Sequence, residues 1–186
     1  MISTAERLLR VAPGGDFARE VETESGAGLA ACLQCAKCTS GCAVAARADI
    51  KPHEMVRPVQ LGARDEVLSS RMIWECTSCE TCAARCPQGV SVAAMIDALR
   101  RLSLAAGKTN ARTDVPTFNG IFLATVKQTG RVYEVGLMAA FKLRTRSFAR
   151  DVGKVPAMLF KRKLALLPSF VKGRAERQRL FKRAGR

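Results

Sequence analysis

The sequence predicts an all-α protein, and three observations support this fold class. Apolar residues recur at intervals of three and four, as on one face of a helix, whereas the valine-rich alternation typical of strands is nearly absent. Glycine, serine and proline stand where these periodic stretches begin or end. Two cysteine-rich loops interrupt the pattern, each with helical stretches before and after it. We therefore expect helices joined by two cysteine loops, with little sheet.

Four helices are expected in residues 1–106. Their ranges are 16–24, 52–61, 65–74 and 91–106. Pro52 suits the first turn of its helix, because the N–H that proline lacks has no helical partner there in any case. Ser91 is a suitable N-cap for the last helix, whose apolar residues share one face, and Gly107 is expected to end it.

Residues 107–186 are expected to form a basic helical extension. Apolar residues occur at helical spacing over 118–141, and shorter amphipathic helices are expected at 151–163 and 175–183. This region contains 19 Lys and Arg against 4 Asp and Glu, whereas residues 1–106 contain 12 of each kind, so the whole net charge of +15 lies in the extension. Short isolated helices are marginal in water. We therefore place a domain boundary between 106 and 107, and expect the extension to pack on the first domain, on partner subunits, or on both.

All eight cysteines fall into two copies of the spacing C-x2-C-x2-C-x3-C, with corresponding cysteines 44 positions apart. The two copies are Cys32, Cys35, Cys38 and Cys42, and then Cys76, Cys79, Cys82 and Cys86. This run is typical of 4Fe–4S clusters, and in ferredoxins that carry two such runs the fourth cysteine of each run ligates the other cluster. We therefore predict two 4Fe–4S clusters. One takes Cys32, Cys35, Cys38 and Cys86, and the other takes Cys76, Cys79, Cys82 and Cys42.

Two other uses of the cysteines are weaker. Eight thiolates can form two tetrahedral zinc sites, but zinc usually takes separated C-x2-C pairs, which leaves the third and fourth cysteines of each run without a role. A disulfide framework is typical of short secreted chains, and this chain shows no secretory signal. Pro87 follows the second run as in ferredoxins, whereas Ala43 follows the first.

Cofactor neighbours are predicted from position along the chain. Shielding side chains are expected at Val44, Ile73, Val90 and Val92, and backbone amides that donate to sulfur at Thr39, Gly41, Thr77, Ser78 and Gly89. Trp74 is expected to pack beside a cluster. The single histidine, His53, is expected near a helix start and not as a ligand, because the eight thiolates complete both sets.

Composition limits the function classes. No apolar stretch is long enough to span a bilayer, so no transmembrane segment is expected, and cofactors with free thiolates point to the reducing cytoplasm. No acid–base pair and no phosphate-binding glycine loop stands out, so we predict no catalytic residue in this chain. The basic extension is compatible with nucleic acid or anionic lipid, but no nucleic-acid recognition motif is present, and the acidic surface of another protein explains the charge equally well.

Several motifs together resemble the HdrC-type iron–sulfur chain of heterodisulfide reductase and of related bacterial complexes. They are the two cysteine runs, Trp74-Glu75-Cys76-Thr77-Ser78-Cys79, Cys86-Pro87-Gln88-Gly89-Val90, Pro52-His53, Val59-Gln60-Leu61-Gly62 and Lys163-Leu164-Ala165-Leu166-Leu167-Pro168. The resemblance covers about residues 16–182. It implies an α-helical ferredoxin domain with two 4Fe–4S clusters, in a hetero-oligomer. There the chain relays electrons between an HdrA-like partner, which carries flavin and iron–sulfur clusters, and an HdrB-like catalytic partner.

The cysteine runs alone do not separate this family from the iron–sulfur subunits of succinate, glycolate or glycerol-3-phosphate oxidoreductases. The chain shows no plant-type ferredoxin domain, which argues against the succinate type. It also shows no cysteine-rich C-terminal module, which argues against fused members of the other two. An iron–sulfur nucleic-acid-binding protein is a more distant alternative.

Overall fold

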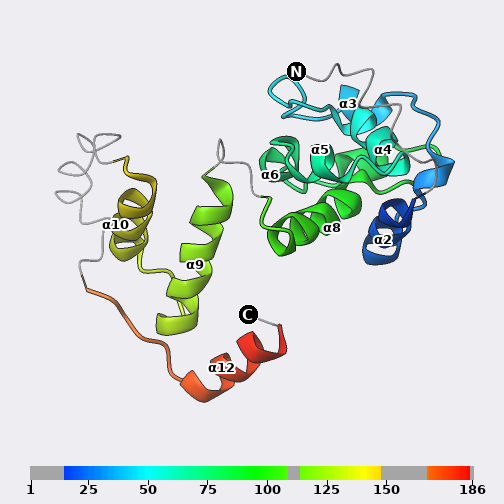
Figure 1. The fold of residues 1–186 in the computed structure, drawn as a ribbon. Helices are drawn as coiled ribbons and strands as arrows, with labels where there is room; N and C mark the ends of the chain where they lie inside the picture. The colour runs from blue at the N-terminus through cyan, green and yellow to red at the C-terminus, as the bar shows by residue number, and fades with distance from the viewer. Residues whose placement is uncertain (1–14, 109–113, 148–166, 185–186) are drawn as a thin grey trace. The chain divides into compact units, whose positions relative to one another are not determined.

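The computed structural model of the chain describes residues 15–108, 114–147 and 167–184, shown as coloured ribbon in Figure 1. These residues form helices and contain no strand, which confirms the all-α prediction. The chain separates into two compact units, Met1–Thr113 and Asp114–Arg186, so the division falls a few residues beyond Gly107. The helix expected at 151–163 lies outside the described residues.

The first unit is built from short helices around one longer helix. In chain order they are α2 (Asp16–Ser25), the 3-10 turn η1 (Leu29–Ala31), α3 (Lys37–Ser40), α4 (Pro52–Gln60), α5 (Arg64–Leu68), α6 (Met72–Glu75), α7 (Thr81–Ala84) and α8 (Val92–Ala105). Three of the expected helices are confirmed, as α2, α4 and α8. The hydroxyl of Ser91 accepts the amide of Ala94, so it caps α8 as predicted.

The prediction of one helix over 65–74 is wrong. The chain forms α5 and α6 instead, separated by a break at Ser69–Arg71. The carboxylate of Asp49 accepts hydrogen bonds from the amides of Arg71 and Met72 and from the hydroxyl of Ser70, at 2.6–2.9 Å. Asp49 therefore acts from a distant loop as the N-terminal cap of α6, and its bonds replace those of a continuous helix.

Helix α8 lies at the centre of the core. Its residues Met95, Ile96 and Leu99 are at most 1 % exposed, and α2, α4, α5, α6 and α7 all pack against it. Burial of each such side chain contributes about 1.5–3 kcal/mol. This packing makes α8 the fixed support against which both cysteine loops are arranged.

The second unit contains α9 (Val115–Thr129), α10 (Glu134–Thr145) and α12 (Arg174–Arg183), the last close to the expected 175–183. The helical spacing over 118–141 is divided because Gly130 ends α9 with a left-handed φ of 86°. The ring of Phe118 packs on those of Phe122 and Phe141 between α9 and α10.

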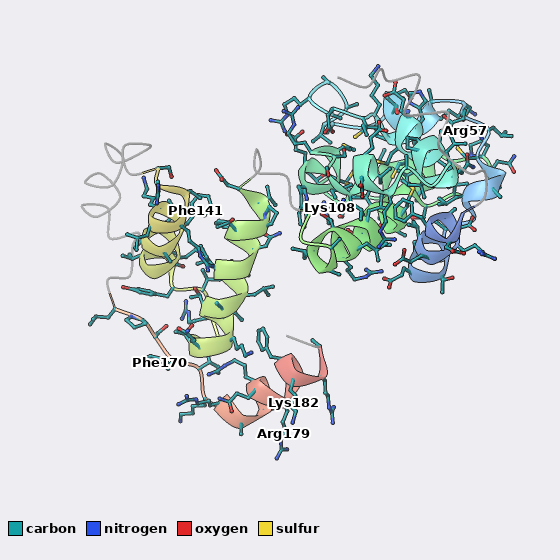
Figure 2. All side chains as sticks on the ribbon, viewed as in Figure 1. Arg57, Lys108, Phe141, Phe170, Arg179 and Lys182 are labelled. Atoms are coloured by element: carbon teal, nitrogen blue, oxygen red, sulfur yellow. The ribbon has the colours of Figure 1, made fainter. Side chains whose placement is uncertain are left out.

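Helix α12 is held to α9 by hydrogen bonds from Arg177. The guanidinium of Arg177 donates to the carbonyls of Lys127 and Gln128, which helix α9 leaves without helical partners at its end. Other basic side chains of α12, among them Arg179 and Lys182, are exposed (Figure 2). None of the described helices combines the length and the apolar character needed to cross a membrane.

Candidate metal centres

The two cysteine runs fold into loops with the same backbone. Each loop leads into a one-turn helix, α3 in the first copy and α7 in the second. In each loop the residues on either side of the second cysteine adopt left-handed conformations. They are Gln34 (φ 55°) and Ala36 (φ 59°) in the first loop, and Ser78 (φ 50°) and Glu80 (φ 58°) in the second. Left-handed φ costs a non-glycine residue about 1–2 kcal/mol, and such strain gathers at functional sites.

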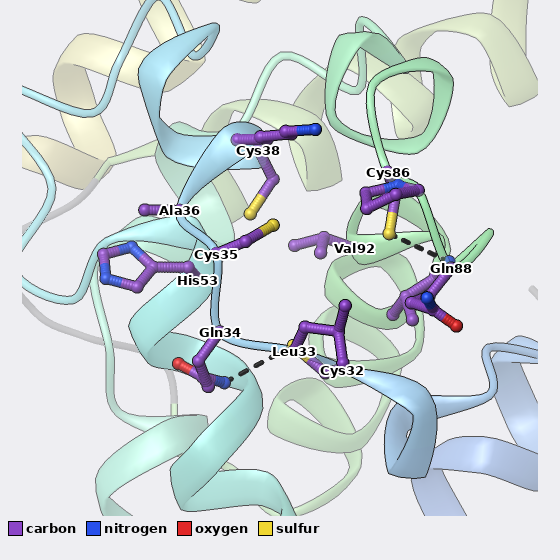
Figure 3. A pocket seen from close by; sticks show the side chains of 13 residues that line it. Cys32, Leu33, Gln34, Cys35, Ala36, Cys38, His53, Cys86, Gln88 and Val92 are labelled. Carbon is purple, nitrogen blue, oxygen red and sulfur yellow. Dashed lines mark hydrogen bonds between the residues drawn. The ribbon is translucent and has the colours of Figure 1, made fainter.

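The first loop frames a pocket together with one cysteine of the second run. The side chains of Cys32, Cys35 and Cys38 and that of Cys86 surround it, as Figure 3 shows. The pocket encloses about 370 Å³ not filled by atoms, its open mouth included. Leu33, Pro87, Val90 and Val92 give it apolar walls.

The second loop frames the complementary pocket. Cys76, Cys79 and Cys82 line it with Cys42 of the first run, around about 390 Å³ of empty space, again with its open mouth. Met72, Ala93 and Ile96 form part of its apolar wall. The structure therefore brings together the same two sets of four cysteines that the sequence predicts as ligand sets.

One valine belongs to both pockets. Val92, the first residue of α8, lines each of them and is 3 % exposed, and in Figure 3 it lies among the cysteines of the first pocket. Val44 and Val90 line one pocket each, as expected for shielding residues. Ile73 is fully buried but is not among the lining residues of either pocket.

In the part of the chain that the structure describes, the backbone amides of Ser78 and Val90 donate hydrogen bonds to cysteine sulfur. The amide of Ser78 donates to Cys76 Sγ at 3.4 Å, as predicted. The amide of Val90 donates to Cys86 Sγ at 3.3 Å, whereas that of Gly89 goes to the carbonyl of Cys86, so the prediction for Gly89 is wrong.

A further nitrogen donor is the side chain of Gln34, which was not predicted from the sequence. Gln34 Nε2 lies 3.4 Å from Cys32 Sγ. Because a glutamine side chain has several rotamers within reach, its position between two cysteines does not by itself predict this bond.

Burial governs the acidity of the inner cysteines. It raises the pKa of Cys38, Cys76 and Cys82, because a thiolate is poorly solvated there. The amide of Ser78 and the charge of Arg100 partly offset this rise in pKa at Cys76. At exposed Cys79 the Thr81 hydroxyl lowers the pKa. A bound metal would favour the thiolate form of these inner cysteines, because its positive charge opposes the effect of burial on their pKa.

His53 lies beside the first sulfur set, whereas Trp74, which was expected beside a cluster, is not among the lining residues of either pocket. His53, on the first turn of α4, lines the first pocket, and both its amide and its Nδ1 lie within 3.1 Å of Thr39 Oγ1. This pair ties α4 to α3. Trp74 is 5 % exposed and packs in the apolar core.

The donor set fits a 4Fe–4S cluster in each pocket. Each pocket offers four sulfur donors around a shared hollow, with apolar walls and N–H groups aimed at sulfur, and thiolates are the ligands that such clusters take. In the described part of the chain, no group of three or more His, Cys, Asp or Glu side chains is arranged to hold a single metal ion.

Comparison with known proteins shows what the cysteine-containing region is similar to. Residues 31–91 match the model of the 4Fe-4S dicluster domain. This segment contains both cysteine runs and ends at the cap of α8. The match confirms the predicted cofactor, 4Fe–4S clusters on a dicluster domain.

Curated relatives agree with the predicted resemblance, and the three described here are named as C subunits of heterodisulfide reductases. The one from the CoB–CoM heterodisulfide reductase of Methanopyrus kandleri is 38 % identical over 86 residues, 46 % of this chain and 45 % of the relative. The C2 chain of the H2/formate:CoB-CoM heterodisulfide,ferredoxin reductase of Methanococcus maripaludis is 40 % identical over 81 residues, 44 % of each chain. The C chain of the H2:CoB-CoM heterodisulfide,ferredoxin reductase of Methanothermobacter thermautotrophicus is 29 % identical over 92 residues, 50 % of each.

The chain thus spans about half the length of the curated relatives it matches. Both cysteine runs lie within the segment that matches the dicluster model. Residues 31–91 therefore match the 4Fe-4S dicluster domain model, and the predicted resemblance to the HdrC-type chain of heterodisulfide reductase is confirmed over about half of the sequence.

Proposed function

We propose that this chain is the electron-relay subunit of a cytoplasmic complex related to heterodisulfide reductase. Its partners in this proposal are an HdrA-like protein with flavin and an HdrB-like protein that carries the disulfide chemistry. The observation that carries the proposal is the pairing of cysteines, since each pocket combines three cysteines of one run with the fourth of the other. A 4Fe–4S cluster, when bound, takes up and releases single electrons.

The eight cysteines are proposed as the complete ligand set. Cys32, Cys35, Cys38 and Cys86 would hold one cluster, and Cys76, Cys79, Cys82 and Cys42 the other. This exchange joins two loops that lie 44 residues apart, so the folding of the first unit and the loading of its cofactors are coupled.

The remaining work of the chain is to exclude water and to direct N–H groups at sulfur. Val92 separates the two pockets with a small apolar side chain, which keeps polar groups and water out of the space between them. The amides of Ser78 and Val90 stabilise negative charge on Cys76 and Cys86. The outer edges stay open to a partner, because Cys35 and Cys79 are exposed.

The basic extension is proposed as a docking element for an acidic partner protein. Exposed Arg179 and Lys182 on α12, with exposed Phe118 and Met138 in the same unit, combine charge for steering with apolar area for binding. The double variant Arg179→Glu/Lys182→Glu is expected to lower co-purification of partner subunits, with unchanged iron content. Unchanged co-purification would contradict this part of the proposal.

Two measurements on the full chain test the function. Anaerobic purification or reconstitution is expected to give a brown protein with about eight irons and eight acid-labile sulfides, and a dithionite-reduced EPR signal. Isolation of the native complex from cells is expected to bring down a flavoprotein and a second redox protein. Bound zinc without labile sulfide would overturn the assignment.

A further inference from the structure

One charged side chain reaches into the second cysteine loop from the central helix. Arg100, on α8, donates through Nε to the carbonyl of Ile73 at 2.5 Å and through Nη2 to the carbonyl of Cys76. Its Nη1 donates to the hydroxyl of Ser78 at 3.0 Å. Ser78 is the residue whose amide donates to Cys76 Sγ. The guanidinium therefore braces both ends of the segment that presents this sulfur.

Arg100 also brings a charge that solvent screens only in part. Its side chain is 22 % exposed, and its guanidinium carries a positive charge. The carboxylate of Asp97, one turn earlier on α8, pairs with Nη1 at 2.8 Å and lies 3.3 Å from the Ser78 hydroxyl. Asp97 is 44 % exposed, so water screens it more than the guanidinium.

The first loop has a different arrangement at the matching position. Gln34 stands where the second loop has Ser78, and its own neutral amide donates to Cys32 Sγ. The second loop instead receives its support from a cation on another element. Among the described residues that line the second pocket, Glu80 is the one with a charged side chain, and its carboxylate is exposed.

We propose that Arg100 is a positioning residue that raises the reduction potential of the second site, framed by Cys42, Cys76, Cys79 and Cys82, and that Asp97 opposes it. The inference rests on the proposed function. Reduction adds negative charge at the sulfurs and irons, so a nearby cation stabilises the reduced form and a nearby carboxylate stabilises the oxidised form. The pair thereby sets how readily the second site holds an electron.

The test is a redox titration of the full-length reconstituted chain, followed by EPR. The comparison is made at the potential where the second site of the unmodified chain is half reduced. There Arg100→Gln is expected to lower the reduced-to-oxidised ratio of this site about tenfold, equal to a shift of about 59 mV for one electron. Asp97→Asn, which keeps the shape of the side chain, is expected to raise the ratio about threefold. Arg100→Lys should restore part of the ratio, because it returns the charge without the fork of donors.

Opposite signs separate electrostatics from loosening of the loop. Damage to the loop would move Arg100→Gln and Asp97→Asn in the same direction, and that result would overturn the inference, as would no shift in either. Arg101→Gln is the matched control, because Arg101 pairs with Glu24 instead of the loop, and it should leave the titration unchanged. A chain that binds neither iron nor sulfide would overturn the proposed function as well, whereas a loaded chain without opposite shifts overturns this inference alone.

Discussion

The two cysteine loops share a backbone but differ in what surrounds them. In both, the residues beside the second cysteine are left-handed, and in both, a one-turn helix follows. The first loop is tied to α4 through the contact of Thr39 with His53. The second is tied to α8 through Arg100.

This difference separates what the cysteine spacing dictates from what packing decides. Three thiols at x2 spacing can face one hollow only if the chain curls tightly, so the curl recurs wherever the spacing recurs. The charges and donors around the sulfurs come from whichever helix packs on the loop. Two sites with the same ligands can therefore hold electrons with different affinity.

The largest expected effect concerns the exchanged cysteines. Cys86→Ser and Cys42→Ser should each lower the iron content from about eight to about four, because each variant leaves one proposed set incomplete. Adding Cys32→Ser to Cys86→Ser should cost little further iron, since both belong to one proposed set. Adding Cys76→Ser to Cys86→Ser should remove most of the remainder, as measured by iron and sulfide analysis. The reverse pattern would show that each run serves its own cluster.

The next largest effect concerns the hydrogen bonds of Asp49 to the start of helix α6. Asp49→Asn should lower the free energy of unfolding by about 1–2 kcal/mol, because an amide replaces a carboxylate that accepts bonds from Ser70, Arg71 and Met72. Burial opposes ionisation of Asp49, but these bonds outweigh it and hold its pKa below the ordinary value.

The sign of the pH effect follows from that lowered pKa. The stabilisation by Asp49 is fully present above its ordinary pKa of 3.8 and is lost as pH falls through the lower folded value. Chemical denaturation of the unmodified chain and of Asp49→Asn is to be compared between pH 7 and pH 3. The difference between their free energies of unfolding is expected to narrow only at the acid end of this range. A difference in free energy of unfolding that stays constant over this whole range would contradict the prediction.

A smaller effect distinguishes the glycines near the ends of the two runs. Gly89→Ala should destabilise by about 1 kcal/mol, because Gly89 has a φ of 67° that a Cβ strains. Gly41 has an ordinary φ of −99°, and a Cβ there would meet only the flexible end of the Arg85 side chain. Gly41→Ala is expected to change the free energy of unfolding by less than about 0.5 kcal/mol. Equal losses of unfolding free energy for Gly89→Ala and Gly41→Ala, measured by chemical denaturation, would contradict this prediction.

The smallest effect probes the left-handed curl itself. Ala36→Gly should stabilise the loaded chain by roughly 0.5 kcal/mol, since relief of strain at φ 59° slightly exceeds the added freedom of the unfolded chain. Ala94→Gly, in helix α8, is the control and should destabilise by about 1 kcal/mol. Denaturant titrations of both variants measure these changes in the free energy of unfolding. If Ala36→Gly destabilises the chain as Ala94→Gly does, the left-handed backbone at residue 36 carries no strain.

The amino-acid sequence by itself determined the cofactor class and the longer helices. Cysteine spacing is a covalent property, so the two runs predict two clusters before any fold is known. Ser91 and the apolar face of α8 are likewise local signals, because capping and periodicity act within a few residues.

Tertiary structure alone decided what acts across the chain. Asp49 splits the expected helix 65–74 from a loop that lies 22 residues before Arg71, and Arg100 braces a loop 22 residues before it. Val92 becomes the common wall of both pockets only when α8 packs against both loops. The physical reason is that hydrogen bonds and charges act through space, and sequence separation carries no information about which long side chain will reach which carbonyl.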